Sequence, residues 1–146
     1  MVFLYQACAA IVLVMLTLVM HSAGTAALIH WIRDHLARGI YRLGSVSSAV
    51  LMVRFVSLII CLHTLEILLW AAFYRWKCLP TWESAFYFSA TTYSTVGYGD
   101  VVLRQTWRLM GPMEGITGVL MCGLSASFMF AIVLKLLVTE SDQSKR

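Results

Sequence analysis

Three stretches of the chain are long and apolar enough to cross a membrane as helices. They cover residues 2–20, 55–74 and 109–134. A helix needs about 20 residues to cross a hydrocarbon core of about 30 Å. A spanning segment must satisfy its own backbone hydrogen bonds, and no run of alternating residues suggests a barrel. The pattern therefore predicts an all-α membrane protein.

The residues after the first stretch have the pattern of an amphipathic helix. Their apolar side chains recur at helical spacing opposite a polar stripe of Asp34, Arg38 and Arg42, as in a helix that lies on a membrane surface. No basic residue precedes the first stretch, which favours a retained membrane helix over a secretory signal. We therefore expect an N-terminal transmembrane helix over residues 1–27 and an interfacial connector over residues 28–46.

The segment between the second and third stretches predicts a helix that is too short to span. Thr81 has the residue type and position of an N-cap, and Glu83 complements the positive end of the helix. The apolar run ends near Tyr93, so this helix must enter the membrane and turn back. The expected elements are an outer helix over residues 47–74, a re-entrant helix over 82–93, an inner helix over 106–137 and a short tail over 138–146.

Composition and charge agree with a membrane protein and indicate which partners it has. Hydrophobic residues make up 60% of the 146 residues and charged residues 12%, which does not suit a soluble domain. The net charge of +4 comes from scattered basic residues, so no nucleic acid is expected as a partner. Arg33, Arg38 and Arg42 lie beside the membrane, where anionic lipid headgroups are their expected partners. Five aromatic residues are expected to form a belt at one surface of the membrane, namely Trp70, Tyr74, Trp76, Trp82 and Trp107.

The re-entrant helix is followed by the sequence STVGYGD, from Ser94 to Asp100. Non-helical backbone is tolerated at membrane depth only where protein covers it or where it lines a wet cavity. Successive carbonyl oxygens face one way when alternate residues take left-handed backbone angles, and Gly97 and Gly99 do so without a clash. The expected result is a ladder of carbonyl oxygens from Thr95, Val96, Gly97 and Tyr98. One ladder cannot surround an ion whereas four identical chains can, so we predict a homotetrameric pore.

These residues resemble the potassium channel superfamily, in particular its compact two-transmembrane pore module. TVGYG matches the signature filter at every position, Asp100 matches the acid that follows it, and the similarity covers roughly residues 47–137. An additional N-terminal helix is not part of that module. The resemblance implies selective, passive K⁺ conduction across a cell membrane, with an external filter and N-terminus, a cytoplasmic C-terminus and no organic cofactor. The residues that it implies as the filter, where K⁺ binds, are Thr95, Val96, Gly97, Tyr98 and Gly99.

The resemblance also implies supports behind the filter. Asp100 tethers the outer filter to the re-entrant helix, and Tyr87 lies where the family often has an aromatic residue that anchors such an acid. Thr91 and Thr92 lie behind the filter, Thr91 at a position where some relatives have a glutamate. We therefore expect a hydrogen bond between Tyr87 and Asp100.

The third stretch is expected to line a cavity below the filter. Gly118 and Gly123 are hinge candidates, although small residues also let membrane helices pack closely. Pro112 removes a backbone donor, so the inner helix either begins near it or kinks there. The residues predicted by helical spacing to face the cavity are Leu120, Gly123, Ser127 and Ala131.

Ionisable groups occur within the second and third stretches at His63, Glu66 and Glu114. An intramembrane carboxyl group suggests a functional site by default, and these groups could form a pH-responsive contact behind the filter. The alternative is structural: Glu66 or Glu114 bonds a neighbouring helix or a hydroxyl group such as that of Thr91 or Thr92.

Other functions fit less of the sequence. His63 and Glu66 lack the paired histidines of a zinc hydrolase, and no nucleophile elbow or phosphate loop occurs, so no enzyme is expected. No segment carries arginine at every third position, so no voltage sensor is expected. A nonselective cation channel and an accessory subunit of a larger channel remain as alternatives to a potassium channel.

Overall fold

The computed structural model describes residues 2–37 and 45–144, which form helices and connecting loops. Its elements are α1 at Val2–Ala37, α2 at Ser45–Lys77, α3 at Trp82–Tyr93, a 3₁₀ turn η2 at Gln105–Trp107 and α4 at Met110–Ser144. Three apolar helical spans are long enough to cross a membrane, at Phe3–Asp34, Ala49–Lys77 and Gln105–Leu134. The chain is therefore an all-α membrane protein with an additional N-terminal helix, as predicted.

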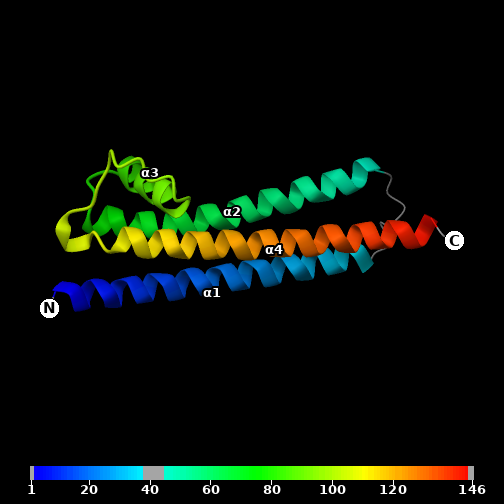
Figure 1. Ribbon diagram of the computed structural model, residues 1–146, viewed down its shortest axis with the longest axis horizontal. Coiled ribbons are helices and arrows are strands. Elements are labelled where there is room, and N and C mark those ends of the chain that lie inside the picture. Colours follow the sequence, from blue (N-terminus) through cyan, green and yellow to red (C-terminus); the bar gives the residue numbers. More distant parts are fainter. Residues whose placement is uncertain (1, 38–44, 145–146) are drawn as a thin grey trace.

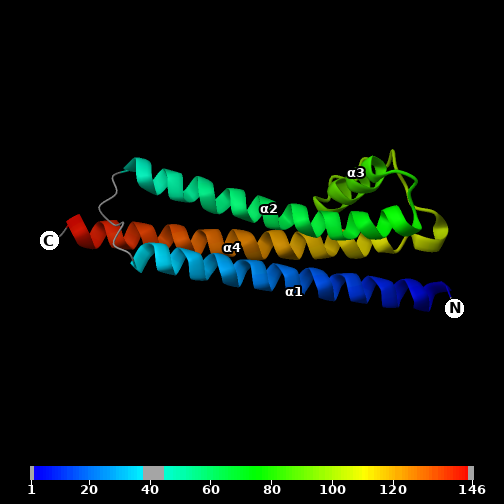
Figure 2. The same ribbon diagram turned by 180° about the vertical axis from the view of Figure 1, so that it is seen from behind.

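The three long helices run side by side, and the short α3 packs at one end of the bundle (Figure 1). Both α3 and α1 contact α2 and α4, and α1 does so on the side away from α3 (Figure 2). The N-terminus lies at the end of the bundle that carries α3, and the C-terminus lies at the opposite end. The loop that follows α3 is therefore held at one end of the molecule, between two spans.

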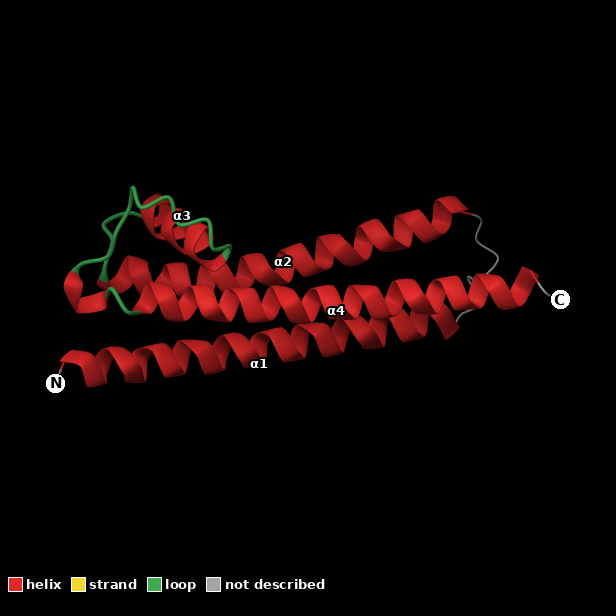
Figure 3. Cartoon of the chain, in the orientation of Figure 1, coloured by secondary structure: helices red, strands yellow, loops and turns green. Residues whose placement is uncertain are grey.

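Helix α3 begins and ends at the predicted residues. Its N-cap is Thr81, which has an extended backbone and whose side-chain oxygen accepts the N–H of Ser84 at 3.1 Å. With 12 residues α3 cannot cross a membrane, since a span needs about 20. The chain leaves it at Ser94 and returns along the helix as a loop (Figure 3).

Helix α1 is longer than expected and corrects the boundary predicted at residue 28. No glycine or proline occurs over residues 28–37, so the helix continues through Ala37 instead of giving way to a separate connector. The amphipathic pattern correctly indicated a helix, but such a pattern does not fix whether that helix continues the preceding one. The rest of the predicted connector, with Arg38 and Arg42, lies outside the described residues up to residue 44.

Helix α4 begins at Met110, four residues after the predicted start, and continues to Ser144. Pro112 lies in its first turn, where a backbone N–H would lack an intrahelical partner in any case. The helix therefore begins near Pro112, which was one of the two possibilities that the sequence left open. The short tail expected from residue 138 is helical as far as Ser144.

The apolar core of the bundle lies at the end that carries α3, and it corrects the predicted aromatic belt. Trp70 and Tyr74 are fully buried there rather than placed at the membrane surface. Their polar atoms have partners inside the protein, because Trp70 Nε1 donates to Thr17 Oγ1 at 3.0 Å and Tyr74 Oη donates to Glu114 at 2.8 Å. Trp76, by contrast, is exposed. The core residues are Ala10, Leu13, Trp70, Ala71, Tyr74, Ala85 and Met110.

Candidate ion-binding site

The loop after α3 has the alternating backbone that its glycines predicted. Gly97 and Gly99 have φ values of 48° and 80°, and Thr95 has a φ value of 61°. Left-handed residues therefore occupy positions 95, 97 and 99. Every residue from Ser94 to Asp100 is exposed in the single chain, so its own subunit does not cover this loop.

Thr95 was not expected to be left-handed. Within the described ranges it is the one residue other than glycine with a positive φ. A left-handed conformation costs an L-residue roughly 1–2 kcal/mol, and such strain persists where the surrounding structure enforces it. Gly97 and Gly99 are left-handed at alternate positions. Continuing this alternation two residues toward the N-terminus would have identified Thr95.

Backbone hydrogen bonds hold the start of this loop against the end of α3. The N–H groups of Thr95 and Gly97 donate to the carbonyl oxygens of Thr92 and Thr91, each at 3.0 Å. These bonds satisfy carbonyl groups that the end of a helix leaves free. Among the described residues, no donor bonds the carbonyl oxygens from Thr95 to Tyr98. The loop thus turns its N–H groups toward α3 and keeps its oxygens available.

A side-chain hydrogen bond holds the far end of the loop on α3. The hydroxyl group of Tyr87 donates to Asp100 Oδ2 at 2.8 Å, which is the bond expected from the sequence. This hydrogen bond raises the pKa of Tyr87, so the phenol keeps the proton that it donates. The loop is therefore attached to α3 both at its beginning and after Gly99.

Replacing Tyr87 with phenylalanine is expected to loosen the outer end of the loop while leaving α3 intact. Because the bond to Asp100 raises the pKa of Tyr87, its contribution is complete below the ordinary pKa of about 10 and is lost as pH rises through the raised value. We expect a small loss of thermal stability at neutral pH that disappears as pH rises through the raised pKa of Tyr87, measured by thermal unfolding of the purified protein. Tyr5→Phe, on α1, is the control, and an equal loss in both variants would remove this role from Tyr87.

Glu114 of α4 is the centre of one buried polar cluster. Its carboxyl group is fully buried, accepts a hydrogen bond from Tyr74 Oη at 2.8 Å and lies 2.5 Å from Ser89 Oγ. Ser89 Oγ also lies 2.9 Å from the carbonyl oxygen of Ile67. A serine has one hydroxyl proton, so a neutral Glu114 that donates to Ser89 would leave every one of these groups satisfied. The cluster joins α2, α3 and α4.

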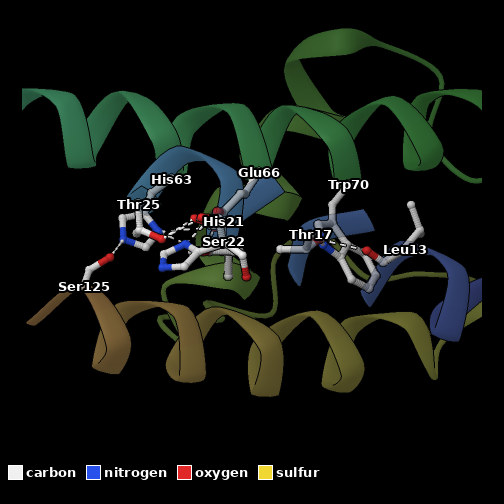
Figure 4. A network of polar contacts seen from close by, with 10 residues as sticks. Leu13, Thr17, His21, Ser22, Thr25, His63, Glu66, Trp70 and Ser125 are labelled. Atoms are coloured by element: carbon white, nitrogen blue, oxygen red, sulfur yellow. Dashed lines mark hydrogen bonds and ion pairs between the residues drawn. The ribbon is translucent and has the colours of Figure 1, made fainter. Parts of the chain in front are cut away.

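Glu66 of α2 is the centre of a second cluster, which also includes residues of α1, α3 and α4. Figure 4 shows the members that come from α1, α2 and α4. Glu66 Oε1 lies 2.8 Å from His21 Nδ1, and its other oxygen accepts a hydrogen bond from the hydroxyl group of Tyr93. His63 Nδ1 lies 2.8 Å from that hydroxyl oxygen, and His63 Nε2 lies 3.0 Å from Ser125 Oγ. The last residue of α3 is therefore tied to α2 and α1 through the Glu66 carboxyl group, and to α4 through His63.

The two carboxyl groups have separate hydrogen-bonding partners, which supports a structural role for each. The hydroxyl groups that they bond differ from the two that were named as examples. Each bonds a hydroxyl group on α3, at Ser89 and at Tyr93, instead of Thr91 or Thr92. The Thr91 hydroxyl donates to backbone carbonyl oxygens of α3 itself. Thr91 therefore accepts a hydrogen bond from the loop through its backbone oxygen, while its hydroxyl group bonds α3.

His21 belongs to the second cluster and was missed from the sequence. It is 2% exposed, between Thr17 and Thr25 on one face of α1. The signal was present, because polar residues recur at every fourth position from Thr17 to Thr25, and such residues within an apolar helix face a protein neighbour rather than lipid. Sequence alone could not identify that neighbour as α2.

The glycines of α4 differ in what they contact. A Cβ atom at Gly118 would lie 2.2 Å from the carbonyl oxygen of Tyr93, so this glycine permits close packing of α4 on α3, and the contact accounts for it without a hinge. A Cβ atom at Gly123 would meet nothing within 4 Å in the described chain, so Gly123 stays a hinge candidate. The residues predicted to face a cavity are all exposed on α4, at Leu120, Gly123, Ser127 and Ala131.

Two apolar spans that flank a short helix and an exposed, alternating loop define this chain as a helical membrane protein. The sequence family described as "Ion channel" matches residues 60–135, just over half of the chain, and the chain belongs to this family. The match covers the end of α2, all of α3, the loop and most of α4, and leaves α1 outside. Membership supports ion transport rather than an enzymatic function. No curated protein and no solved structure matches the chain significantly.

Proposed function

We propose that this ion channel conducts K⁺ selectively and passively. The observation that carries the proposal is the loop backbone, with left-handed residues at positions 95, 97 and 99 and with carbonyl oxygens that no described donor occupies. Oxygens arranged in this way replace the water that a cation loses when it enters a pore. The TVGYG sequence supports K⁺ as that cation, through its resemblance to the potassium channel filter. The proposed K⁺ ligands are Thr95, Val96, Gly97 and Tyr98, with Gly99 completing the filter.

The proposed pore has four copies of the chain, and the surfaces that one chain leaves uncovered support such an assembly. The loop is exposed in the single chain, and so is the α4 face that contains Gly123 and Ser127. In a fourfold assembly the loops would meet on the axis, and these faces of α4 would line a cavity below them. The C-terminal end of α3 carries a partial negative charge, which would favour a cation in that cavity.

We place the loop and the N-terminus outside the cell and the C-terminus in the cytoplasm. The N-terminus and α3 share one end of the bundle, so they lie on the same side of the membrane (Figure 1). Arg33 is exposed near the other end of α1, where the cytoplasmic leaflet offers anionic headgroups. The protein would then be a multi-pass component of the cell membrane.

Ion flux into liposomes that contain only the purified chain tests the proposal. We expect K⁺ flux that external Ba²⁺ blocks, together with much slower Na⁺ flux. Gly99→Ala, which forces an L-residue to a φ near 80°, should abolish the difference between the ions while the helical content is retained. Equal K⁺ and Na⁺ flux in the unaltered chain would identify a nonselective channel, and absence of flux would indicate an accessory subunit.

A further inference from the structure

Two imidazole rings and a carboxyl group converge inside the bundle (Figure 4). His21 comes from α1, His63 and Glu66 come from α2, and one ligand atom of each lies within 4.8 Å of the others. His21 Nδ1 is 2.8 Å from Glu66 Oε1, and His63 Nδ1 is 3.4 Å from Glu66 Oε2. Ligand atoms of a tetrahedral zinc ion, at about 2.0–2.2 Å from the metal, lie about 3.3–3.5 Å from one another. Only small side-chain movements separate the cluster from that geometry.

The donor set selects for a particular class of cation. Imidazole nitrogen suits zinc, copper and nickel, whereas Mg²⁺ and Ca²⁺ take oxygen ligands in larger numbers. A fourth ligand is at hand, because the Tyr93 hydroxyl oxygen lies 2.8 Å from His63 Nδ1 and bonds Glu66. His63 also has the outer partner that metal-bound histidines usually have, since its Nε2 lies 3.0 Å from Ser125 Oγ.

Hydrogen bonds do not satisfy every buried polar atom of this cluster. His21 is 2% exposed, yet its Nε2 has no hydrogen-bond partner among the described residues. Glu66 is 0% exposed, and within the described part of the chain its ion pairs are with the two histidines alone. A divalent cation bound by His21 Nδ1 would neutralise the buried carboxylate without requiring a charged imidazole ring.

We propose that His21, His63 and Glu66 form a binding site for a divalent transition-metal ion. The ion joins α1 to α2 beside Tyr93, the residue at which α3 ends and the loop begins. Binding does not require that the chain conduct K⁺, so the site and the channel function can fail independently.

Metal binding by the purified full-length protein in detergent tests this site, with Zn²⁺ and Co²⁺ as probes. After equilibration at micromolar metal and removal of the excess, we expect one Zn²⁺ per chain by elemental mass spectrometry. Bound Co²⁺ should show the intense visible absorption of a tetrahedral site. His21→Gln and His63→Gln should each weaken binding by more than about tenfold, since loss of outer partners alone has an effect of 10–100-fold.

His30→Gln is the matched control, because His30 lies on the same helix but its side chain is 79% exposed and its contact is with Asp34. It should bind metal as the unaltered protein does. Circular dichroism and the elution volume of each variant report whether it folds, and the Co²⁺ spectrum of the unaltered protein provides a test that needs no variant. Absence of stoichiometric metal, a Co²⁺ spectrum without tetrahedral bands, or binding that both cluster variants retain would each overturn the site.

Discussion

Replacing Gly118 with alanine is expected to abolish ion flux and to destabilise the junction of α3 and α4. A Cβ atom at this position would lie 2.2 Å from the carbonyl oxygen of Tyr93 and 2.9 Å from its carbonyl carbon. Both are backbone atoms, so a change of rotamer cannot relieve the clash and one of the helices must move. Overpacking of this kind costs about 1–3 kcal/mol and occasionally more. The displacement would fall at Tyr93, two residues before Thr95 in the loop that follows α3.

Two other glycines of α4 make this prediction specific. A Cβ atom at Gly123 would meet nothing within 4 Å in the described chain, and one at Gly115 would lie 3.4 Å from the carbonyl oxygen of Thr92. Thermal unfolding in detergent and liposome flux should therefore place Gly123→Ala nearest the unaltered protein, Gly115→Ala next and Gly118→Ala last. Unaltered stability and flux in Gly118→Ala would show that α4 does not pack on Tyr93 as described.

Replacing Glu114 with alanine is expected to have the second large effect, a loss of roughly 2–5 kcal/mol of stability. The carboxyl group is fully buried and bonds the hydroxyl groups of Tyr74 and Ser89, which lie on α2 and α3. Alanine would leave a cavity and remove the acceptor of Tyr74, and lipid offers no water to replace it. Chemical or thermal unfolding of the purified protein measures the loss, and the ion flux should fall with it because Ser89 is part of α3.

Glutamine at the same position separates the shape of the group from its charge. A neutral Glu114 would donate to Ser89 and accept from Tyr74, and a glutamine amide can do both. Glu114→Gln should therefore retain most of the stability that Glu114→Ala loses, with the same dependence of flux on pH as the unaltered protein. If Glu114→Gln were as damaging as Glu114→Ala, an ionised carboxylate would have to be the native form.

The elements that could be predicted are those whose signals are local. Helix α3 is predicted by an N-cap at Thr81, an apolar run that is too short to span a membrane and a glycine-rich loop after it. All three signals lie within about twenty residues of one another. The left-handed positions of Gly97 and Gly99 follow from the lack of a Cβ atom, and the bond from Tyr87 to Asp100 follows from the family resemblance. Thr95 lies in the same loop but has a Cβ atom, so residue type gave no sign of its conformation.

The features that could not be predicted depend on which helices meet. Apolar periodicity shows which residues share one face of a helix. Inside a membrane it does not show whether that face contacts lipid or protein. Trp70 was therefore assigned to the membrane surface, although its indole N–H bonds Thr17 in the core. For the same reason the partner of Glu66 was left open, as a neighbouring helix or a hydroxyl group such as that of Thr91 or Thr92, and the sequence did not identify His21, 45 residues away in the chain.

The contacts of α1 have a consequence for what the smallest working unit of this protein can be. The family match begins at residue 60, yet Glu66 and Trp70 bond residues of α1, well before it. Without α1, one oxygen of the Glu66 carboxylate and the Trp70 indole N–H would lose their partners, and fatty-acyl chains offer no replacement. Helix α1 thus supplies α2 with hydrogen-bonding partners that the lipid cannot provide. A shortened channel built from residues 45–144 would first need apolar replacements at both positions.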